Sequence, residues 1–283
     1  MWLVAPGSRR GPLVFSLMET DLPLPDGRTL HVYDTGAGTP VFWHHGTPQI
    51  GAVPAPLLAL DGIRWLSYDR PGYGGSTSSP GRTIGSAASD AAAVADSLGV
   101  ERFSVLGHSG GANHAMACAA LLPSRVTRCV TVGALAPFEP VALDWWAGMV
   151  APEELRASVV GHDALAAQLA SAPFDENSFT PADHAAVSGA WSDLGRNAGI
   201  ATANGLSGMI DDDLAYVTPW GFAVSDIHCP TLLIHGVEDR IIPFSHAEWL
   251  ARHLPSADLR PSPSDGHISA LDRVLDVVEF LHG

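Results

Sequence analysis

The chain has 283 residues, of which 46% are hydrophobic, and its formal net charge is −15. This length and apolar content are enough for one large α/β domain, or for such a domain with an insertion. Because the chain is so acidic, we expect neither nucleic acid nor an anionic membrane as a partner. These numbers leave the oligomeric state open.

The N-terminal segment, residues 1–17, is expected to be a flexible extension outside the fold. Its two arginines follow a short apolar stretch, and no apolar core of about 7–15 residues comes after them, so the pattern does not predict a secretory signal. No uncharged apolar run of about 18 residues occurs in the chain, and no membrane span is expected. The three cysteines are scattered and form no metal-type pair, which predicts reduced thiols and a cytoplasmic location.

The first predicted elements form a hairpin over residues 22–33, with Asp26-Gly27 as its turn. Further strands are predicted at 39–43, 63–68, 102–106, 126–132, 230–235 and 257–261. Helices are predicted at 55–60, 86–98, 112–122, 245–254 and 268–281, the last of them amphipathic. Near-continuous apolar strands that alternate with helices predict an α/β fold, with a mostly parallel central sheet covered by helices on both faces.

This alternation stops between residues 137 and 225, where the chain is helical, aromatic and acidic without clear strands. We therefore expect a helical cap at 137–225, inserted into a core domain made of 18–136 and 226–283. Residues 134–226 hold thirteen acidic residues and two arginines, a net charge of −11 that disfavours anionic substrates. Three consecutive aspartates, Asp211 to Asp213, cannot all face one ion, and we expect them at a solvated helix N-terminus.

The pentapeptide Gly107-His108-Ser109-Gly110-Gly111 lies between a predicted strand and a predicted helix. This is the context of a nucleophile elbow, in which a serine occupies a strained turn and its hydroxyl points out over the sheet edge. Glycines flank the serine because larger side chains would clash in so tight a turn. The amide of Gly110 then lies at a helix N-terminus, where negative charge is favoured.

Three further segments follow predicted strands and supply the remaining groups of a serine catalytic site. The loop His44-His45-Gly46-Thr47-Pro48 can aim an amide, that of Thr47, at an oxyanion alongside Gly110. Asp239 follows a late strand and can orient a histidine, and His267 lies in the loop before the last helix. Glu238 and Asp265 are alternative acids, but the spacing after the strand favours Asp239, and Asp265 before a glycine suits a turn.

These motifs resemble the α/β-hydrolase fold superfamily over about residues 20–283. The resemblance rests on the pentapeptide, His45-Gly46-Thr47-Pro48, the segment from Asp69 to Ser76, the segment from His235 to Asp239, and Asp265-Gly266-His267. It implies a Ser109–Asp239–His267 triad, an oxyanion hole of Thr47 and Gly110, and the cap after the sixth strand. The histidine pair before the glycine and the tyrosine in Pro-Gly-Tyr-Gly fit the esterase-like branch.

The resemblance predicts a serine hydrolase that cleaves a small neutral, apolar ester or lactone through an acyl-enzyme. The alternatives are the same triad acting on an amide or peptide, a C–C or cyanohydrin-type lyase, and a non-catalytic ligand receptor. Ser109 argues against epoxide hydrolases and haloalkane dehalogenases, which need an aspartate nucleophile. No cofactor or metal is expected, because the glycines at 72, 74 and 75 precede a polar loop and not a dinucleotide-binding helix.

The substrate pocket is the least determined part of the prediction. Its expected lining residues are two histidines near the elbow and apolar side chains of the cap: His45, His108, Trp145, Trp146, Met149, Trp191 and Met209. Simple packing is the alternative for each tryptophan. His44 and His45 are expected to brace the oxyanion loop, His108 to form a wall, and His235 to pack or hydrogen-bond beside the site.

Overall fold

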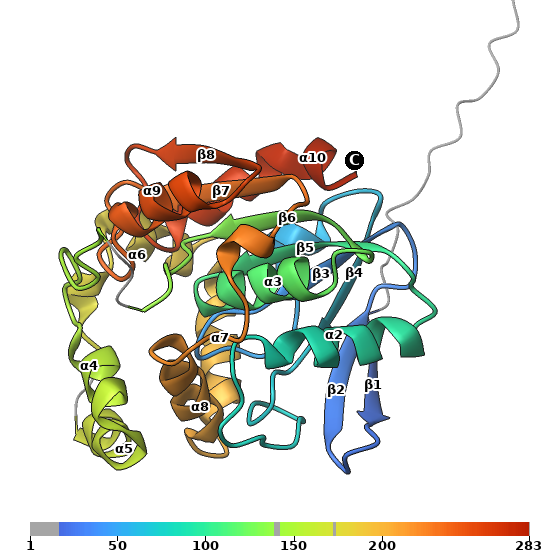
Figure 1. Ribbon diagram of the computed structural model, residues 1–283, viewed down its shortest axis with the longest axis horizontal. Coiled ribbons are helices and arrows are strands. Elements are labelled where there is room, and N and C mark those ends of the chain that lie inside the picture. Colours follow the sequence, from blue (N-terminus) through green and yellow to red (C-terminus); the bar gives the residue numbers. More distant parts are fainter. Residues whose placement is uncertain (1–16, 139–141, 172–173, 283) are drawn as a thin grey trace, which may run out of the picture.

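The computed structural model describes residues 17–138, 142–171 and 174–282. An eight-stranded sheet with the order β1-β2-β4-β3-β5-β6-β7-β8 forms its centre (Figure 1). The strands are β1 (Met18–Pro23), β2 (Thr29–Asp34), β3 (Thr39–His44), β4 (Ile63–Tyr68), β5 (Phe103–His108), β6 (Val126–Val132), β7 (Thr231–Gly236) and β8 (Ala257–Ser262). Residues 1–16 of the expected N-terminal extension lie outside the described residues.

The sheet is mostly parallel, as the sequence predicts. The hairpin of β1 and β2 turns at Gly27, whose φ of +88° suits a residue without a Cβ. Strand β2 also pairs antiparallel with β4, and every other neighbouring pair of strands is parallel. The carboxyl ends of the parallel strands meet at one edge of the sheet, which is where such sheets place their functional groups.

Side chains that alternate along each strand build two separate hydrophobic cores. Phe42 and Val105 face one side of the sheet, where helices α2 (Ser86–Ser97), α3 (Gly110–Leu121) and α9 (Phe244–His253) cover them. Trp43 and Leu106, one residue further along each strand, face the other side, against α1 (Ala55–Leu58) and the C-terminal helices. Apolar residues on both faces of a strand explain why the strands read as continuous apolar runs.

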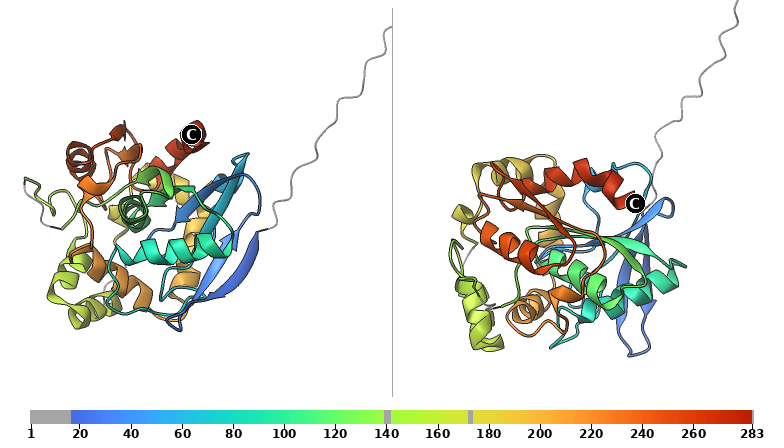
Figure 2. Two further views of the ribbon diagram at one scale, coloured as in Figure 1. Left: turned by 45° about the vertical axis from the view of Figure 1, so that its right-hand side comes forward. Right: turned by 45° about the horizontal axis from the view of Figure 1, so that its top comes forward.

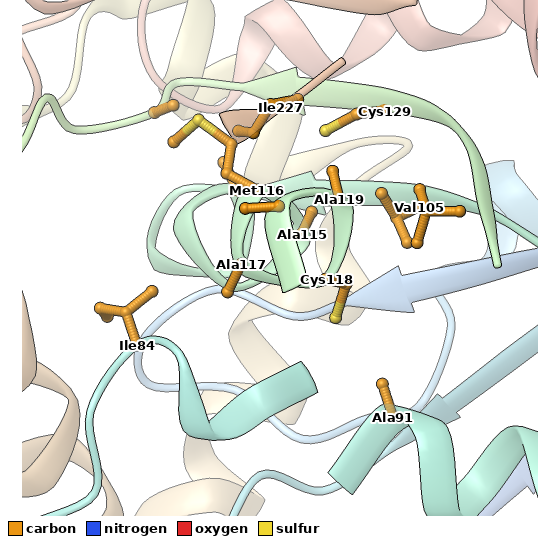
Figure 3. Packing of buried hydrophobic residues seen from close by; sticks show 14 of the residues in the cluster. Ile84, Ala91, Val105, Ala115, Met116, Ala117, Cys118, Ala119, Cys129 and Ile227 are labelled. Atoms are coloured by element: carbon orange, nitrogen blue, oxygen red, sulfur yellow. The ribbon is translucent and has the colours of Figure 1, made fainter. Parts of the chain in front are cut away.

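Helix α3, which follows the elbow, packs into the first core through small side chains. Figure 3 shows Ala115 and Ala119 on the same helix as Cys118, with Val105 and Cys129 of the sheet nearby. Eleven of the twelve residues of α3 are buried. A helix that is buried nearly all round holds its N-terminus, and therefore the elbow, in a fixed position.

The C-terminal segment differs from the prediction of one α-helix. It forms a 3₁₀ helix, η3 (Ser269–Val277), followed by the short α10 (Val278–His282). At its start, the Leu271 N–H donates to the carbonyl of Ile268, three residues back, at 3.0 Å. The N–H groups of Ile268 and Ser269 are held by the carboxylate of Asp183, from another helix, which fixes how the chain enters this segment.

Within the described residues between β6 and β7, where the sequence predicts the cap, the chain forms seven helical segments. They are α4 (Glu153–Val160), α5 (His162–Ser171), η1 (Glu176–Ser178), α6 (Pro181–Ser188), α7 (Ser192–Thr202), α8 (Ser207–Tyr216) and η2 (Val224–Asp226). Figures 1 and 2 show α4 and α5 side by side at one end of the molecule. Residues 139–141 and 172–173 of this segment lie outside the described residues, and the domain boundaries stay a prediction. Across the part of the chain that the structure describes, each helix is too short or too polar to cross a membrane.

The prediction for Asp211, Asp212 and Asp213 was wrong. They lie within α8, not at a solvated N-terminus, and their exposed fractions are only 7%, 0% and 3%. Burying a carboxylate is costly unless it is paired or protonated. The sequence does not show the tertiary contact that explains this burial, in which two arginines of the core domain pair with Asp212.

Candidate active site

Ser109 lies at the strained turn between β5 and α3. Its φ of 55° and ψ of −131° are unusual for a residue with a side chain, and strain of this kind is typical of functional turns. A Cβ on Gly107 would collide with the carbonyl of Gly111, and one on Gly111 would collide with the carbonyls of His44 and His45. The two glycines are therefore required by close packing. Ser109 is partly exposed, whereas the residues on both sides of it are buried.

Gly110 is the first residue of α3, so its N–H has no acceptor within the helix. The side chains of Tyr216 and Thr47 lie against its Cα, because a Cβ at this position would collide with the Tyr216 hydroxyl and lie 2.8 Å from Thr47 Oγ1. Thr47 and Gly110, the two predicted amide donors, are thus neighbours in space. A two-donor oxyanion hole requires that its two donors are neighbours.

Arg70 holds the loop that carries Thr47. Its guanidinium donates to the carbonyl of His45 and, at 2.9 Å, to that of Gly46. The Arg70 backbone N–H donates to His45 Nε2 at 3.0 Å, so His45 carries its proton on Nδ1, which donates to the Gly46 carbonyl at 2.8 Å. Burial and the Arg70 charge lower the pKa of His45 well below its usual value. His45 is therefore a neutral brace of this loop.

Asp212 of α8 is the counterion of Arg70. Its carboxylate lies 2.6 Å from Arg70 Nη2 and 2.5 Å from Arg82 Nη1, and it accepts hydrogen bonds from the hydroxyls of Tyr73 at 2.8 Å and Thr47 at 2.7 Å. Burial alone would raise the pKa of Asp212, but the two arginines hold it well below the usual value. One carboxylate of the insertion is thereby bonded to three segments of the core domain.

The hydroxyl of Thr47 takes part in a defined chain of hydrogen bonds. Thr47 Oγ1 accepts from Arg70 Nη2 at 3.1 Å and donates its hydrogen to Asp212. The hydroxyl of Tyr216, 2.7 Å away, must therefore donate to Thr47 Oγ1. Tyr216 thus connects the last turn of α8 to the loop that carries Thr47.

Asp239 and His267 are hydrogen-bonded in a buried site. Asp239 Oδ2 lies 2.7 Å from His267 Nδ1, while Oδ1 accepts the N–H groups of Ile241 and Ile242, both at 2.9 Å. Burial opposes the charge on Asp239, but His267 and His235 lower its pKa below the usual value. Burial likewise opposes the charge on His267, but Asp239, with a smaller effect of Asp183, raises the pKa of His267. The alternative acid Glu238 is exposed.

Because the carboxylate can only accept, His267 Nδ1 carries a hydrogen and Nε2 is left as the basic nitrogen. His108, directly before Ser109, packs its ring on that of His267, with 5.0 Å between centroids, and its Nε2 donates to the His267 carbonyl at 3.0 Å. Burial, with a further effect of His267, lowers the pKa of His108 to about 3. His108 is thus a neutral support for the histidine.

His235 lies on the other side of the acid. Its Nε2 lies 2.7 Å from the carbonyl of Ile242 and 3.4 Å from Asp239 Oδ2. The ring is 1% exposed. As expected from the sequence, it packs and hydrogen-bonds beside the site.

The structure does not bring the expected pocket residues together in one wall. Trp145 is buried in the first core and donates to the Ala136 carbonyl at 3.0 Å, with Trp146 and Met149 packed against the same cluster. Trp191 is buried in the second core, where its Nε1 donates to Asp272 at 2.7 Å, and Met209 packs on a third cluster. These side chains serve mainly as core, the alternative considered for the tryptophans.

A groove of about 520 Å³ was not predicted from the sequence. It is lined by two segments near the ends of the insertion: Pro137, Phe138, Val217, Thr218, Pro219, Trp220, Gly221 and Phe222. Its volume is in the range of small-molecule sites. Over the described ranges, no cluster of three or more histidine, cysteine, aspartate or glutamate side chains could hold a metal ion.

Sequence reasoning missed four residues around the site: Arg70, Asp183, Asp212 and Tyr216. Asp183 belongs to a capping box, and the spacing of Thr180 and Asp183 before a helix is a pattern that could have revealed the helix start. The other three are brought together by tertiary packing across more than 100 residues of sequence, as the 142-residue separation of Arg70 and Asp212 illustrates. A single sequence contains no local pattern for such a pair.

Comparison with known proteins agrees with the fold. The family model for the alpha/beta hydrolase fold matches residues 39–274. A non-heme haloperoxidase of Rhodococcus erythropolis is 29% identical over 86% of this chain and 90% of its own length. A pimeloyl-[acyl-carrier protein] methyl ester esterase of Aromatoleum aromaticum is 30% identical over 81% of this chain and 90% of its own. The solved enol-lactonase of Burkholderia xenovorans covers 93% of this chain and 100% of its own with a TM-score of 0.70 at 21% identity, which bears on the fold alone.

Proposed function

Since the chain belongs to the α/β-hydrolase fold family, we propose that it is a serine hydrolase that cleaves a small neutral carboxylic ester or lactone. The observation that carries the proposal is the buried hydrogen bond of 2.7 Å between Asp239 and His267, in a chain whose strained elbow presents Ser109. A carboxylate that fixes a neutral histidine is what the activation of a serine requires. The esterase name of the relative that is 30% identical adds support.

In the proposed mechanism, His267 Nε2 takes the proton of Ser109 as the serine oxygen attacks the carbonyl carbon. The amides of Thr47 and Gly110 donate to the oxygen that becomes negative, and one such donor typically contributes roughly 10²–10³ in rate. His267 then gives the proton to the leaving alkoxide, which departs as the alcohol. Water activated by His267 releases the acid from the acyl-enzyme, and Asp239 stabilises the imidazolium at each stage.

A neutral substrate is supported by the charges around the oxyanion loop. Arg70, which contacts the loop, and Arg82 are both paired with Asp212 and are almost fully buried. Neither guanidinium is available to bind a substrate carboxylate, and the acidic insertion would repel one.

The test is a panel of p-nitrophenyl esters of increasing acyl length, together with lactones, assayed with the wild type and with Ser109→Ala. We expect turnover of short or medium esters by the wild type, and a loss of about 10⁴-fold or more in kcat for Ser109→Ala. Esterase activity that survives in Ser109→Ala would contradict the serine mechanism. Turnover of an amide substrate in preference to every ester would change the bond assigned but not the nucleophile.

A further inference from the structure

Asp183 of α6 is a buried carboxylate that the proposed mechanism does not use. It is 0% exposed and lies in the insertion, 84 residues before His267. Six donors from the described residues bond to its two carboxylate oxygens. The fold therefore holds this carboxylate in a fixed position, and its hydrogen-bond partners show which segment it supports.

Four of these six donors belong to the loop that carries the predicted catalytic histidine. The backbone N–H of His267 donates to Oδ2 at 3.2 Å, and those of Ile268 and Ser269 donate to Oδ1, both at 2.8 Å. The Ser269 hydroxyl adds a fourth contact from this loop at 2.9 Å, and it also accepts the Gly266 N–H at 2.8 Å. The carboxylate therefore fixes three consecutive residues of the histidine loop.

The remaining donors tie the same carboxylate to its own helix. The N–H and the hydroxyl of Thr180, the N-cap of α6, each donate to Asp183 Oδ2 at 3.0 Å, and the Asp183 N–H donates back to Thr180 Oγ1. This is a capping box. An ordinary capping box needs only the N-cap contacts, so the four bonds to the histidine loop are an additional use of this side chain.

Gly266 allows this approach. A Cβ at this position would collide with Asp183 Oδ2 and lie 2.8 Å from Thr180 Oγ1. The glycine before the histidine, which suits a turn, therefore also gives α6 access to the loop backbone. Asp183 and Gly266 thus form a complementary pair across the insertion and the core domain.

The charge of Asp183 also acts on the imidazole. Four titratable residues surround His267. They are Asp239 after β7, His108 of β5, His235 behind Asp239, and Asp183 of α6. Burial opposes the charge on Asp183, but its hydrogen bonds with Ser269 and Thr180 lower its pKa, so it is ionised near neutral pH. Its effect on the pKa of His267 is in the same direction as that of Asp239 and smaller.

We propose that Asp183 is a positioning residue for catalysis: it fixes the backbone of the His267 loop from the insertion and supports the imidazolium that forms during the reaction. The inference rests on the proposed role of His267 as the base. In this proposal the insertion is part of the framework that positions the catalytic histidine. Substrate would not touch Asp183.

The test compares Asp183→Asn with Asp226→Asn. Asp226 occupies the equivalent third position of η2 and accepts the N-cap N–H of Ala223 at 3.1 Å, but it is exposed. Both variants lose one charge and one helix-capping carboxylate. In Asp183→Asn, the amide group must direct donors at N–H groups, so the loop shifts, and we expect kcat to fall roughly 10–100-fold with KM little changed. Asp226→Asn should keep wild-type kcat.

The decisive readout is the protonation of His267, which a purely structural role would not change. We expect the acid limb of kcat/KM to move to lower pH in Asp183→Asn, and the His267 ring titration followed by NMR to move the same way. The NMR signal is assigned by its loss in His267→Gln and needs no turnover, so this arm holds even if the wild type cleaves no ester. A folded Asp183→Asn whose His267 titration matches the wild type would overturn the inference.

Ser269→Ala keeps the inference testable if Asp183→Asn fails to fold. It removes one donor to Asp183 and leaves its charge, and we expect kcat to fall about tenfold, the usual effect of losing one hydrogen bond to a charged group. Wild-type kcat in Ser269→Ala would count against the inference. If the wild type is inactive on every ester while the His267 titration still depends on Asp183, only the proposed function fails.

Discussion

Replacing Asp212 by asparagine should destabilise the protein more than any exchange of a surface acid. Its carboxylate is 0% exposed, and the two arginines that it pairs with, Arg70 and Arg82, have side chains only 1% and 4% exposed. Asparagine keeps the volume but leaves two buried cations without their anion. Breaking a buried ion pair typically costs about 3–5 kcal/mol.

This cost can be converted to a melting temperature. An unfolding entropy of roughly 2.1 cal/mol/K per residue, over 283 residues, is about 0.6 kcal/mol/K. We therefore expect Tm to fall by about 5–8 °C in Asp212→Asn. The matched control is Asp96→Asn, which breaks a pair with Arg125 of 2.8 Å in which Asp96 is 70% exposed, and its Tm should stay within about 2 °C of the wild type.

The same variant should slow catalysis, because Arg70 also holds the carbonyls of His45 and Gly46. Thermal unfolding followed by circular dichroism measures the first effect, and ester hydrolysis at 25 °C, well below Tm, measures the second. We expect kcat to fall in Asp212→Asn and not in Asp96→Asn. A Tm change as small as that of the control would refute the argument that Asp212 is a required counterion.

Three further predictions concern the acid and the pH dependence of activity and of stability. Asp239→Asn should lose roughly 10⁴ in kcat because His267 loses its orienting carboxylate, whereas Glu238→Gln should stay near wild type, and the reverse order would show that the acid is misassigned. The free base of His267 is the active form and its pKa is raised, so kcat/KM should rise with pH through that pKa. Because folding lowers the pKa of Asp212, its charge stabilises the folded protein fully above the unfolded pKa of about 3.9. This stabilisation is lost as the pH falls through the lower, folded pKa. Tm should therefore drop less steeply in acid for Asp212→Asn, which lacks this group.

The sequence predicted well whatever depends on local pattern. The strand at 63–68 matches β4 residue for residue, and the 86–98 helix ends within one residue of α2. Alternating burial on two faces made each strand a continuous apolar run that could be recognised directly. The pairing of Asp239 with His267 was also predicted, because the carboxyl ends of parallel strands place such residues at one edge.

The sequence failed where one side chain meets another across a long stretch of chain. Asp212 looks like part of a polar helix start, and only the arrival of Arg70 and Arg82 explains its burial. Trp191 looked like a pocket residue, but its indole N–H has a partner in Asp272 and its ring fills the second core. A buried aromatic side chain and a ligand-binding one have the same local signature, so tertiary contacts alone separate them.

The central claim is that Ser109 is a nucleophile activated by His267. Its most direct test is labelling with a fluorophosphonate probe, followed by mass spectrometry of the intact protein and of its peptides. The account predicts one adduct per wild-type chain, located on Ser109, and no adduct in Ser109→Ala. A wild type that stays unlabelled at high probe concentration, or an adduct that persists in Ser109→Ala, would contradict it.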